Sequence, residues 1–142
     1  MNREQILAFM NENSAAVVAT SEDNIPHLRT IWTVKSDENG VLFHTGKMKE
    51  FYGQLVKNPH VEMCFMNPDK SIQIRVSGYA RQFEDNRLKQ ELLEKRTFLK
   101  DIERKTGSLD FLSLFLLEKC RALVWTFATN AAPKEYVDLC AT

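Results

Sequence analysis

The sequence predicts a mainly β protein in which six or seven antiparallel strands close into a barrel, with three flanking helices at its edges and ends. Short runs of alternating or continuous apolar residues recur along the chain, and turn-forming segments separate them. The chain has 142 residues, of which 44% are hydrophobic. That is enough for one domain spanning 1–142, which needs neither disulfides nor a structural metal to fold.

The first part of the chain predicts one helix followed by three strands. Apolar residues at Ile6–Met10 mark the buried face of a short helix. Residues 15–20 form an apolar strand, and residues 27–35 alternate in the manner of a second strand. Asn39–Gly40 favours a tight hairpin turn, after which residues 41–45 return as the third strand. We expect these three strands to form an antiparallel meander.

The remainder of the chain predicts further strands and two helical segments. Gly78 lies inside a long predicted strand and indicates a bulge. The segment at 85–105 is predicted as a charged amphipathic helical region, whose alternating charges are typical of a solvated helix face. In order, the expected elements are a helix at 48–57, strands at 61–66 and 71–83, the helical region at 85–105, a buried strand at 111–128 and a short strand at 135–139.

Composition excludes several classes of function. The 19 basic and 19 acidic residues cancel, so no overall field attracts nucleic acid or an anionic membrane. No apolar run is long enough for a membrane helix, and three cysteines without a CxxC pair suit reduced thiols in the cytoplasm. No two histidines and no two cysteines lie within five residues of each other, so we expect no metal site.

A strand that runs directly into a helix at residues 43–49 carries the main functional signal. Lys47 and Lys49 fall in the expected first turn, where positive charge opposes the helix dipole. A bound phosphate would be favoured by the free backbone N–H groups, by the dipole and by both lysines. Arg29 is expected on a neighbouring strand and in reach of the same anion. The alternatives are two solvated lysines and a surface salt bridge of Arg29.

Several segments taken together resemble one known family. They are Pro26–Ile31, Gly40–Lys49, Gln54–Leu55 with Asn58–Pro59, and Gln73–Ala80. In order and spacing they are similar to the pyridoxamine 5'-phosphate oxidase-like family of FMN-binding split barrels, over roughly residues 3 to 130. The similarity extends to its short bacterial members, the flavoproteins of the general-stress and nitroimidazole-resistance type.

The resemblance implies a split β-barrel that forms a homodimer with FMN at the interface. It implies that Arg29 meets the FMN phosphate and that Gln73 bonds the ribityl or ring region. Trp125 and Phe127 would reach the flavin across the dimer, and the alternative for both is a place in the core. The full set of cofactor-binding residues that it implies is Arg29, Thr30, Ile31, His44, Thr45, Lys47, Lys49, Gln73 and Trp125.

The sequence also departs from the family's oxidase. Lys49-Glu50-Phe51 stands where the oxidase has a Ser-Arg-Lys run, and Val34 stands where it has a lysine. The arginine and histidine segment that the oxidase uses for its vitamin substrate has no counterpart at the C-terminal end. We therefore expect a rebuilt phosphate site and no pyridoxamine 5'-phosphate oxidation.

The function that this resemblance implies depends on the flavin. We expect a cytoplasmic FMN-dependent oxidoreductase that passes electrons from a reduced nicotinamide, or another small donor, to a small acceptor in the dimer cleft. His44 and Tyr79 are the candidates for a proton-transferring residue, and His44 as a wall residue beside the flavin is the more common role. The alternatives are a protein that binds or senses flavin, haem or a deazaflavin without turnover, and a ligand-free dimer.

Overall fold

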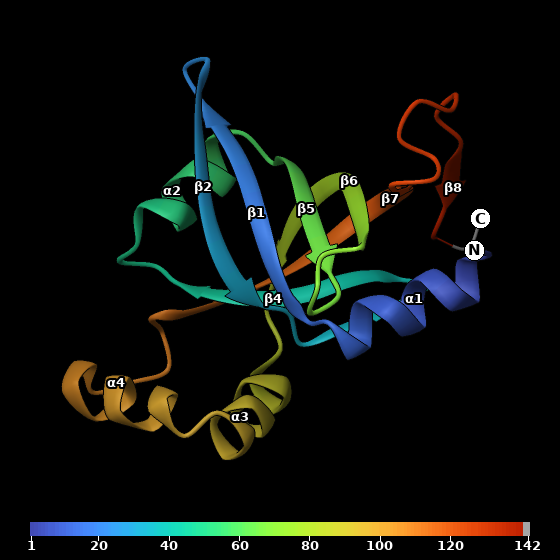
Figure 1. Ribbon diagram of the computed structural model, residues 1–142. Helices are drawn as coiled ribbons and strands as arrows, with labels where there is room; N and C mark the ends of the chain where they lie inside the picture. Colours follow the sequence, from blue (N-terminus) through green and yellow to red (C-terminus); the bar gives the residue numbers. More distant parts are fainter. Residues whose placement is uncertain (141–142) are drawn as a thin grey trace.

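The computed structural model describes residues 1–140 as one antiparallel sheet with helices around it (Figure 1). The strands are β1 (Ala15–Glu22), β2 (Ile25–Trp32), β3 (Lys35–Asp37), β4 (Gly40–Gly46), β5 (His60–Met66), β6 (Ile72–Phe83), β7 (Leu112–Thr126) and β8 (Tyr136–Asp138). The helices are α1 (Arg3–Glu12), α2 (Glu50–Lys57), α3 (Asn86–Lys95) and α4 (Phe98–Thr106). None of these helices is long and apolar enough to cross a membrane.

The strand order is β2-β1-β5-β6-β7-β4-β3, with β8 paired to β7. The two outermost strands, β2 and β3, are joined by Thr33 and Val34 alone. The Thr33 N–H donates to the Ser14 carbonyl (2.9 Å) and the Val34 N–H to the Leu42 carbonyl (2.8 Å). The chain therefore steps from the β1 ladder to the β4 ladder, and the sheet curls into a split barrel whose ladder does not close.

Two expectations about this region are wrong. The single strand predicted at 27–35 is broken into β2 and β3, which makes eight strands in place of six or seven. The predicted meander does not form, because β2 pairs with β1, whereas β4 pairs with β3 and β7. Alternation along a strand shows which side chains share a face, but it carries no information about which distant strand is the neighbour.

The barrel interior is filled by alternate residues of its strands. Phe43, Phe65, Met63 and Ile74 are completely buried there. The ring of Phe43 stacks on that of Phe115 with the centroids 5.5 Å apart. Such alternation is the pattern expected of strands with one face on a core.

A second apolar cluster lies under α3 and α4, which sit together at one end of the molecule, away from α1 (Figure 1). Leu92, Leu99 and Leu114 are buried in it. The amphipathic helical region predicted at 85–105 is two helices that pack on the strands, with the break at Arg96 and Thr97.

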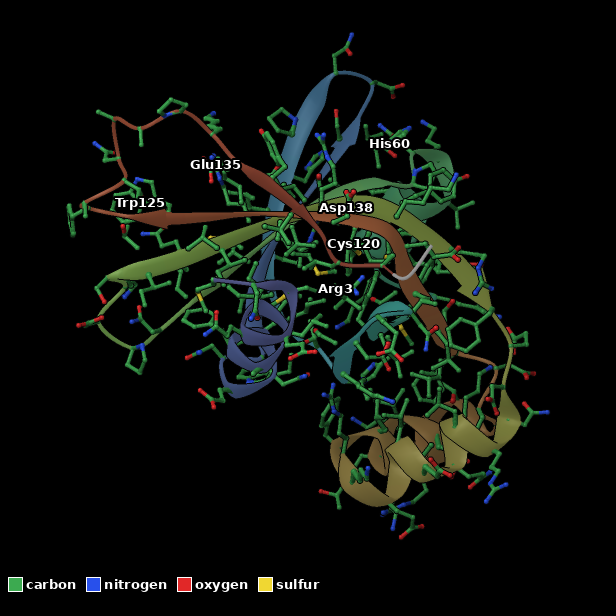
Figure 2. The ribbon with its side chains drawn as sticks, turned by 90° about the vertical axis from the view of Figure 1, so that its right-hand side faces the viewer. Arg3, His60, Cys120, Trp125, Glu135 and Asp138 are labelled. Atoms are coloured by element: carbon green, nitrogen blue, oxygen red, sulfur yellow. The ribbon has the colours of Figure 1, made fainter. Side chains whose placement is uncertain are left out.

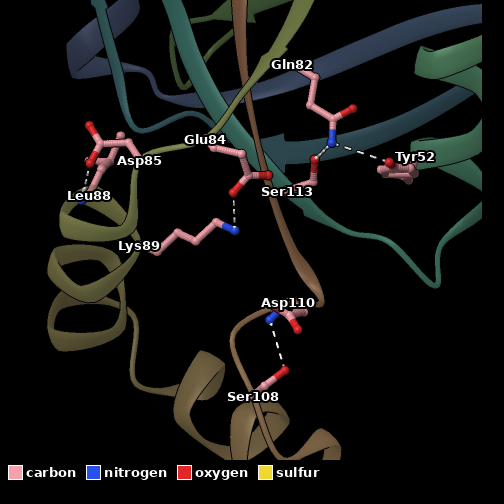
Figure 3. A network of polar contacts seen from close by, with 9 residues as sticks. All are labelled: Tyr52, Gln82, Glu84, Asp85, Leu88, Lys89, Ser108, Asp110 and Ser113. Carbon is pink, nitrogen blue, oxygen red and sulfur yellow. Dashed lines mark hydrogen bonds and ion pairs between the residues drawn. The ribbon is translucent and has the colours of Figure 1, made fainter.

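Polar contacts reinforce the junction between the sheet and α3 (Figure 3). The Gln82 amide donates to the Ser113 hydroxyl (2.8 Å) and more weakly to the Tyr52 hydroxyl (3.3 Å). Nearby, the almost fully buried ammonium group of Lys89 donates to the Glu84 carboxylate at 2.9 Å. A charge in an apolar setting needs such a partner, so this pair fixes the start of α3.

The predicted bulge at Gly78 is confirmed. The register between β6 and β7 shifts between Ser77 and Tyr79. A Cβ atom on Gly78 would lie 2.6 Å from the Glu118 carbonyl oxygen. Only glycine lets the two strands approach so closely there.

The sheet side opposite the core, here called the outer sheet face, has an apolar part that begins on β2. On β2 it exposes Leu28 (70%) and Trp32 (66%). It continues with Val17 of β1 and Cys64 of β5, which are cross-strand partners, and with Trp125 of β7. Charged side chains also lie on this face, namely Glu62 of β5 and Arg75 of β6, so it combines an apolar part with a polar one.

Candidate functional site

A cleft of about 910 Å³ lies between β2, the end of β4, the start of α2 and the α3–α4 pair. Its volume falls within the range of small-molecule sites. It opens beside the place where the sheet splits, because the strands on its two sides, β2 and β4, are not hydrogen-bonded to each other. The chain's topology thus leaves a gap that side chains line but do not fill.

Most of the residues selected from the sequence line this cleft. The ones that do are Arg29, Thr30, Ile31, His44, Thr45 and Lys49. Lys47, Gln73 and Trp125 are not among the lining residues. Tyr79 also lies elsewhere, with its ring edge-on to that of His60 at 5.7 Å.

Arg29 is held in place by a buried network. Its Nη1 donates to the Thr20 hydroxyl at 2.7 Å, and its Nη2 donates to the Gln54 side-chain oxygen. The Thr20 hydroxyl donates to that same Gln54 oxygen at 2.7 Å. The guanidinium also lies 4.4 Å from the centre of the Phe51 ring. Arg29 therefore contacts α2. The expected pairing of its strand with the strand at 41–45 is wrong, although both strands line the cleft.

The charge on Arg29 is stable in this setting. Burial lowers the pKa of its guanidinium, and the carboxylate of Glu50 opposes that effect. An arginine starts so far above neutral pH that it stays protonated. The cleft thus has a fixed cation with several N–H donors, oriented before any ligand arrives.

The start of α2 forms the adjoining part of the wall. Lys49 is the N-cap residue, and no side chain caps the helix. Glu50 occupies the first turn, where a carboxylate suits the dipole. Lys47 and Lys49 both precede the helix, so the conflict with the dipole is smaller than predicted. Both side chains are exposed, and the Lys47 N–H donates to the Phe111 carbonyl at 2.8 Å.

His44 lies on the opposite wall and is bonded to a residue that the sequence did not single out. Nη1 of Arg96 is 2.9 Å from Nε2 of His44. Burial, together with the positive charges of Arg96 and Lys49, lowers the pKa of His44 to about 4. The imidazole is therefore neutral at physiological pH, and no sequence signal distinguishes Arg96 from other arginines in the charged helical region.

Gln73 and Trp125 are neighbours on adjacent strands, directly opposite each other in the β6–β7 ladder. Figure 2 shows Trp125 at the end of β7 that lies away from α3 and α4. The Trp125 indole N–H donates to the Asn130 side-chain oxygen at 2.8 Å, and its ring meets that of Phe127 edge-on. Within one chain these two residues do not meet the cleft, and both are on the outer sheet face.

The part of the chain that the structure describes contains no cluster of potential metal ligands. Residues 1–140 bring together no group of three or more His, Cys, Asp or Glu side chains that could hold a metal ion.

Solved structures of other proteins share this arrangement. A NimC/NimA family protein from Clostridium acetobutylicum matches with a TM-score of 0.74 and 22% identity, over 96% of this chain and 93% of that one. A pyridoxamine 5'-phosphate oxidase-related, FMN-binding protein from Nostoc punctiforme gives 0.62 and 17% identity, over 94% and 88%. HutZ, the haem storage protein from Vibrio cholerae, gives 0.61 and 17% identity, over 83% and 90%. These likenesses establish the fold.

Sequence comparison identifies the family. A pyridoxine/pyridoxamine 5'-phosphate oxidase from Haemophilus influenzae is 32% identical over 79 residues, which is 55% of this chain and 38% of that relative. The chain thus spans less than half the length of this relative. The family model described as pyridoxamine 5'-phosphate oxidase matches residues 3–114. Because that match covers most of the sequence, the chain belongs to the pyridoxamine 5'-phosphate oxidase family of split barrels.

Proposed function

We propose that the cleft binds FMN and that the protein is a flavoprotein oxidoreductase, which takes electrons from a reduced nicotinamide or another small donor and passes them to a small acceptor. One observation carries the proposal. Residues chosen from the sequence for their resemblance to FMN ligands, on β2, on β4 and before α2, line a single cleft of suitable size.

The phosphate of FMN would lie between Arg29 and Lys49. Arg29 is a fixed cation with donors to spare, and Lys49 stands at the N-terminus of α2, where the dipole favours an anion. Among residues 1–140, Glu50 is the one acidic residue that lines the cleft, and it compensates for part of the positive charge. The residues present therefore fit a phosphate ester, with Lys49 in place of the oxidase's arginine and lysine.

The ring of FMN would lie against the apolar part of the cleft. Trp32, Met48, Phe98 and Ile102 supply apolar surface there. Bound FMN supplies the electron transfer, and these side chains orient it and exclude water. His44 faces the same part of the cleft as a neutral hydrogen-bonding residue.

A second copy of the chain would complete the site. Leu28, Thr30 and Trp32 belong to the cleft and also to β2, the edge strand of the outer sheet face. A copy packed on that face would bring its own Gln73 and Trp125 close to the cleft. This supports the homodimer that the resemblance implies, with each cofactor held by both chains.

Binding without turnover is the alternative, and for haem the histidine of the cleft that could serve as an axial ligand is His27 rather than His44. Haem storage by a protein of the same fold motivates this possibility. Haem iron requires an axial ligand, most often the nitrogen of a histidine. The Nε2 atom of His44 is occupied by Arg96, so His44 is not free for that role without breaking this contact.

The test begins with the absorption spectrum of the purified protein and a titration of the flavin-free form with FMN. Flavin bands and saturable binding are expected. Arg29→Ala and Lys49→Ala should weaken binding, by about tenfold or more each, because each removes a charged partner of the phosphate. Lys47→Ala tests whether Lys47, which the sequence also predicts to bind the phosphate, contributes to FMN binding. Arg87→Ala is the control, since its side chain on α3 is 92% exposed and outside the cleft.

Turnover is tested separately, by anaerobic reduction of the bound flavin with reduced nicotinamide and reoxidation by small acceptors. A yellow protein that no nicotinamide reduces would favour binding or sensing. His44→Gln should leave the reduction rate within about threefold if His44 is a wall residue, and a loss beyond about 100-fold would make it catalytic. A colourless protein indifferent to FMN would contradict the proposed function itself.

A further inference from the structure

Arg96 joins three parts of the molecule that are distant in the sequence. It follows the last residue of α3 and immediately precedes Thr97, the N-cap of α4. Its Nη1 donates to the Trp32 carbonyl (3.0 Å) and contacts Nε2 of His44 (2.9 Å), and its Nη2 donates to the Thr33 carbonyl (3.0 Å). Trp32 and Thr33 lie where the chain passes from β2 to β3. One guanidinium therefore links the α3–α4 pair to both sides of the split in the sheet.

The chemistry of this contact determines where the proton of His44 lies. A guanidinium has only N–H donors and cannot accept a hydrogen bond. The Nε2 atom of His44 must therefore be the acceptor, so it carries no proton. A neutral imidazole has one N–H, which is then on Nδ1.

We infer that Arg96 is a positioning residue of the cleft, which clamps the α3–α4 pair over the split and holds His44 in the Nδ1–H tautomer. The Nδ1–H group makes no hydrogen bond within residues 1–140, although His44 is half-buried and lines the cleft. Because His44 lines the cleft, this donor is available to a ligand bound there. The ligand atom that meets His44 is therefore an acceptor, a carbonyl oxygen or an unprotonated ring nitrogen.

The inference that the ligand presents an acceptor to His44 rests on the proposed function, whereas the inference about the His44 tautomer does not. The edge of an oxidised flavin ring presents two carbonyl oxygens and two unprotonated nitrogens as acceptors, beside a single N–H donor. A pyridine carboxamide or a quinone would present the same kind of atom. A ligand edge consisting only of N–H donors is excluded from this position, because it would meet another donor.

The charges around His44 keep the ring in its neutral form. Arg96 faces it from the α3–α4 break and Lys49 from the start of α2. The other charged or titratable groups that line the cleft are Arg29 and His27 on β2, Glu50 on α2 and Lys95 on α3. Because most of these groups are cations and the ring is largely buried, the pKa of His44 is lowered to about 4. The donor on Nδ1 is thus present throughout the physiological range.

The experiment is heteronuclear NMR of the ligand-free protein with ¹⁵N-labelled histidine. Couplings of the ring nitrogens to the carbon-bound protons identify the tautomer directly. We expect wild-type His44 to have a protonated Nδ1 and an unprotonated Nε2 at neutral pH, with no titration down to about pH 5. This measurement needs no variant and no flavin, so it stands whether or not the protein binds FMN.

Variants separate positioning from simple packing. Arg96→Met removes the donors and keeps the aliphatic stem, so His44 should lose the single tautomer and its pKa should move up. Arg96→Lys retains one charged donor and should restore the tautomer in part. Lys95→Met is the matched control: it removes the adjacent cation, which also lines the cleft but forms none of these bonds, and it should leave the tautomer unchanged.

The same variants can then be titrated with FMN. Arg96→Met should weaken FMN binding about fivefold, which corresponds to the loss of one hydrogen bond. Lys95→Met should weaken it by less than about twofold. A wild-type His44 with its proton on Nε2 would overturn the inference, and so would an Arg96→Met protein with unchanged tautomer and pKa. Absence of FMN binding with the expected tautomer would instead contradict the proposed function and leave the role of Arg96 intact.

Discussion

Arg29 and His44 face one cleft but are fixed by different means. Arg29 is held by neutral hydrogen-bond acceptors, the Thr20 hydroxyl and the Gln54 amide oxygen, so its charge is uncompensated in that network. His44 is held by the charged donor Arg96, and this positive charge disfavours protonation of the His44 ring. The first arrangement suits binding of an anion, and the second suits donation to a neutral acceptor.

Thr20 is the residue on which the Arg29 network depends. It is only 3% exposed, accepts from Arg29 and donates to Gln54. Thr20→Val keeps its shape and removes the hydroxyl, so we expect the free energy of unfolding to fall by about 1–3 kcal/mol. Thr20→Ser keeps the hydroxyl and should lose less. Urea denaturation checks this, and equal stability of wild type and Thr20→Val would show that the network contributes nothing.

His44 should make the stability depend on pH. Its pKa falls from 6.5 in the unfolded chain to about 4 in the fold. Between these values the unfolded state binds more protons, so the free energy of unfolding decreases on acidification, by up to about 1.4 kcal/mol per pH unit. Below about pH 4 the dependence ends, because both states are protonated.

The matched variant for this prediction is His44→Gln, which has no titrating group there. Urea denaturation at about pH 7 and about pH 5 gives the loss of stability for each protein. Wild type should lose more than the variant. Equal losses would mean that His44 titrates normally in the fold.

At the scale of elements, the sequence predicts where helices and strands lie better than how they associate. The hairpin at Asn39–Gly40 and the bulge at Gly78 follow from local backbone chemistry, and both form as predicted. The break of the strand at Thr33 does not follow, since it results from two ladders that compete for one segment. The break between α3 and α4 does not follow either, because charged residues run through the whole segment.

In the cleft, too, some residues can be predicted from the sequence and others cannot. Motif residues near Arg29 and His44 are recognisable because they lie in short segments of fixed spacing. Arg96 is not recognisable, because its partners are carbonyl groups at Trp32 and Thr33, and every residue has a carbonyl. Contacts from a side chain to a distant backbone leave no mark in the sequence.

Two glycines with opposite surroundings test the element-scale account. Gly78→Ala places a Cβ atom against the Glu118 carbonyl and the Leu117 side chain, and should destabilise the fold by about 1–3 kcal/mol. Gly53→Ala, in α2, meets nothing within 4 Å and should stabilise it by about 0.5–1 kcal/mol. Thermal melting of both variants decides this. Similar behaviour of the two would contradict the close packing of β6 on β7.

At the scale of the whole molecule, the outer sheet face and the cleft share the strand β2. The exposed side chains of Leu28 and Trp32 connect the two surfaces. In the proposed homodimer, this geometry would bring Gln73 and Trp125, which the resemblance assigns to the flavin, to the cleft of the partner chain. It predicts that dimerisation and cofactor binding are coupled.

Val17 tests that coupling, because it lies on the outer face of β1 and not in the cleft. We expect wild type to sediment as a dimer and Val17→Glu to shift toward the monomer, with weaker FMN binding, because the substitution places two carboxylates in an apolar interface. Arg87→Glu, on exposed α3, changes charge in the same direction and should remain dimeric. A monomeric wild type that binds FMN tightly would refute the composite site.

The most direct test of the central claim compares the affinity of the flavin-free protein for FMN with its affinity for riboflavin, which lacks the phosphate. If Arg29 and Lys49 hold the phosphate, FMN should bind about 100-fold more tightly, and Arg29→Met should reduce this ratio to about tenfold. Equal affinity for the two flavins, or a ratio that Arg29→Met leaves unchanged, would contradict the account of the cleft as a phosphate-anchored flavin site.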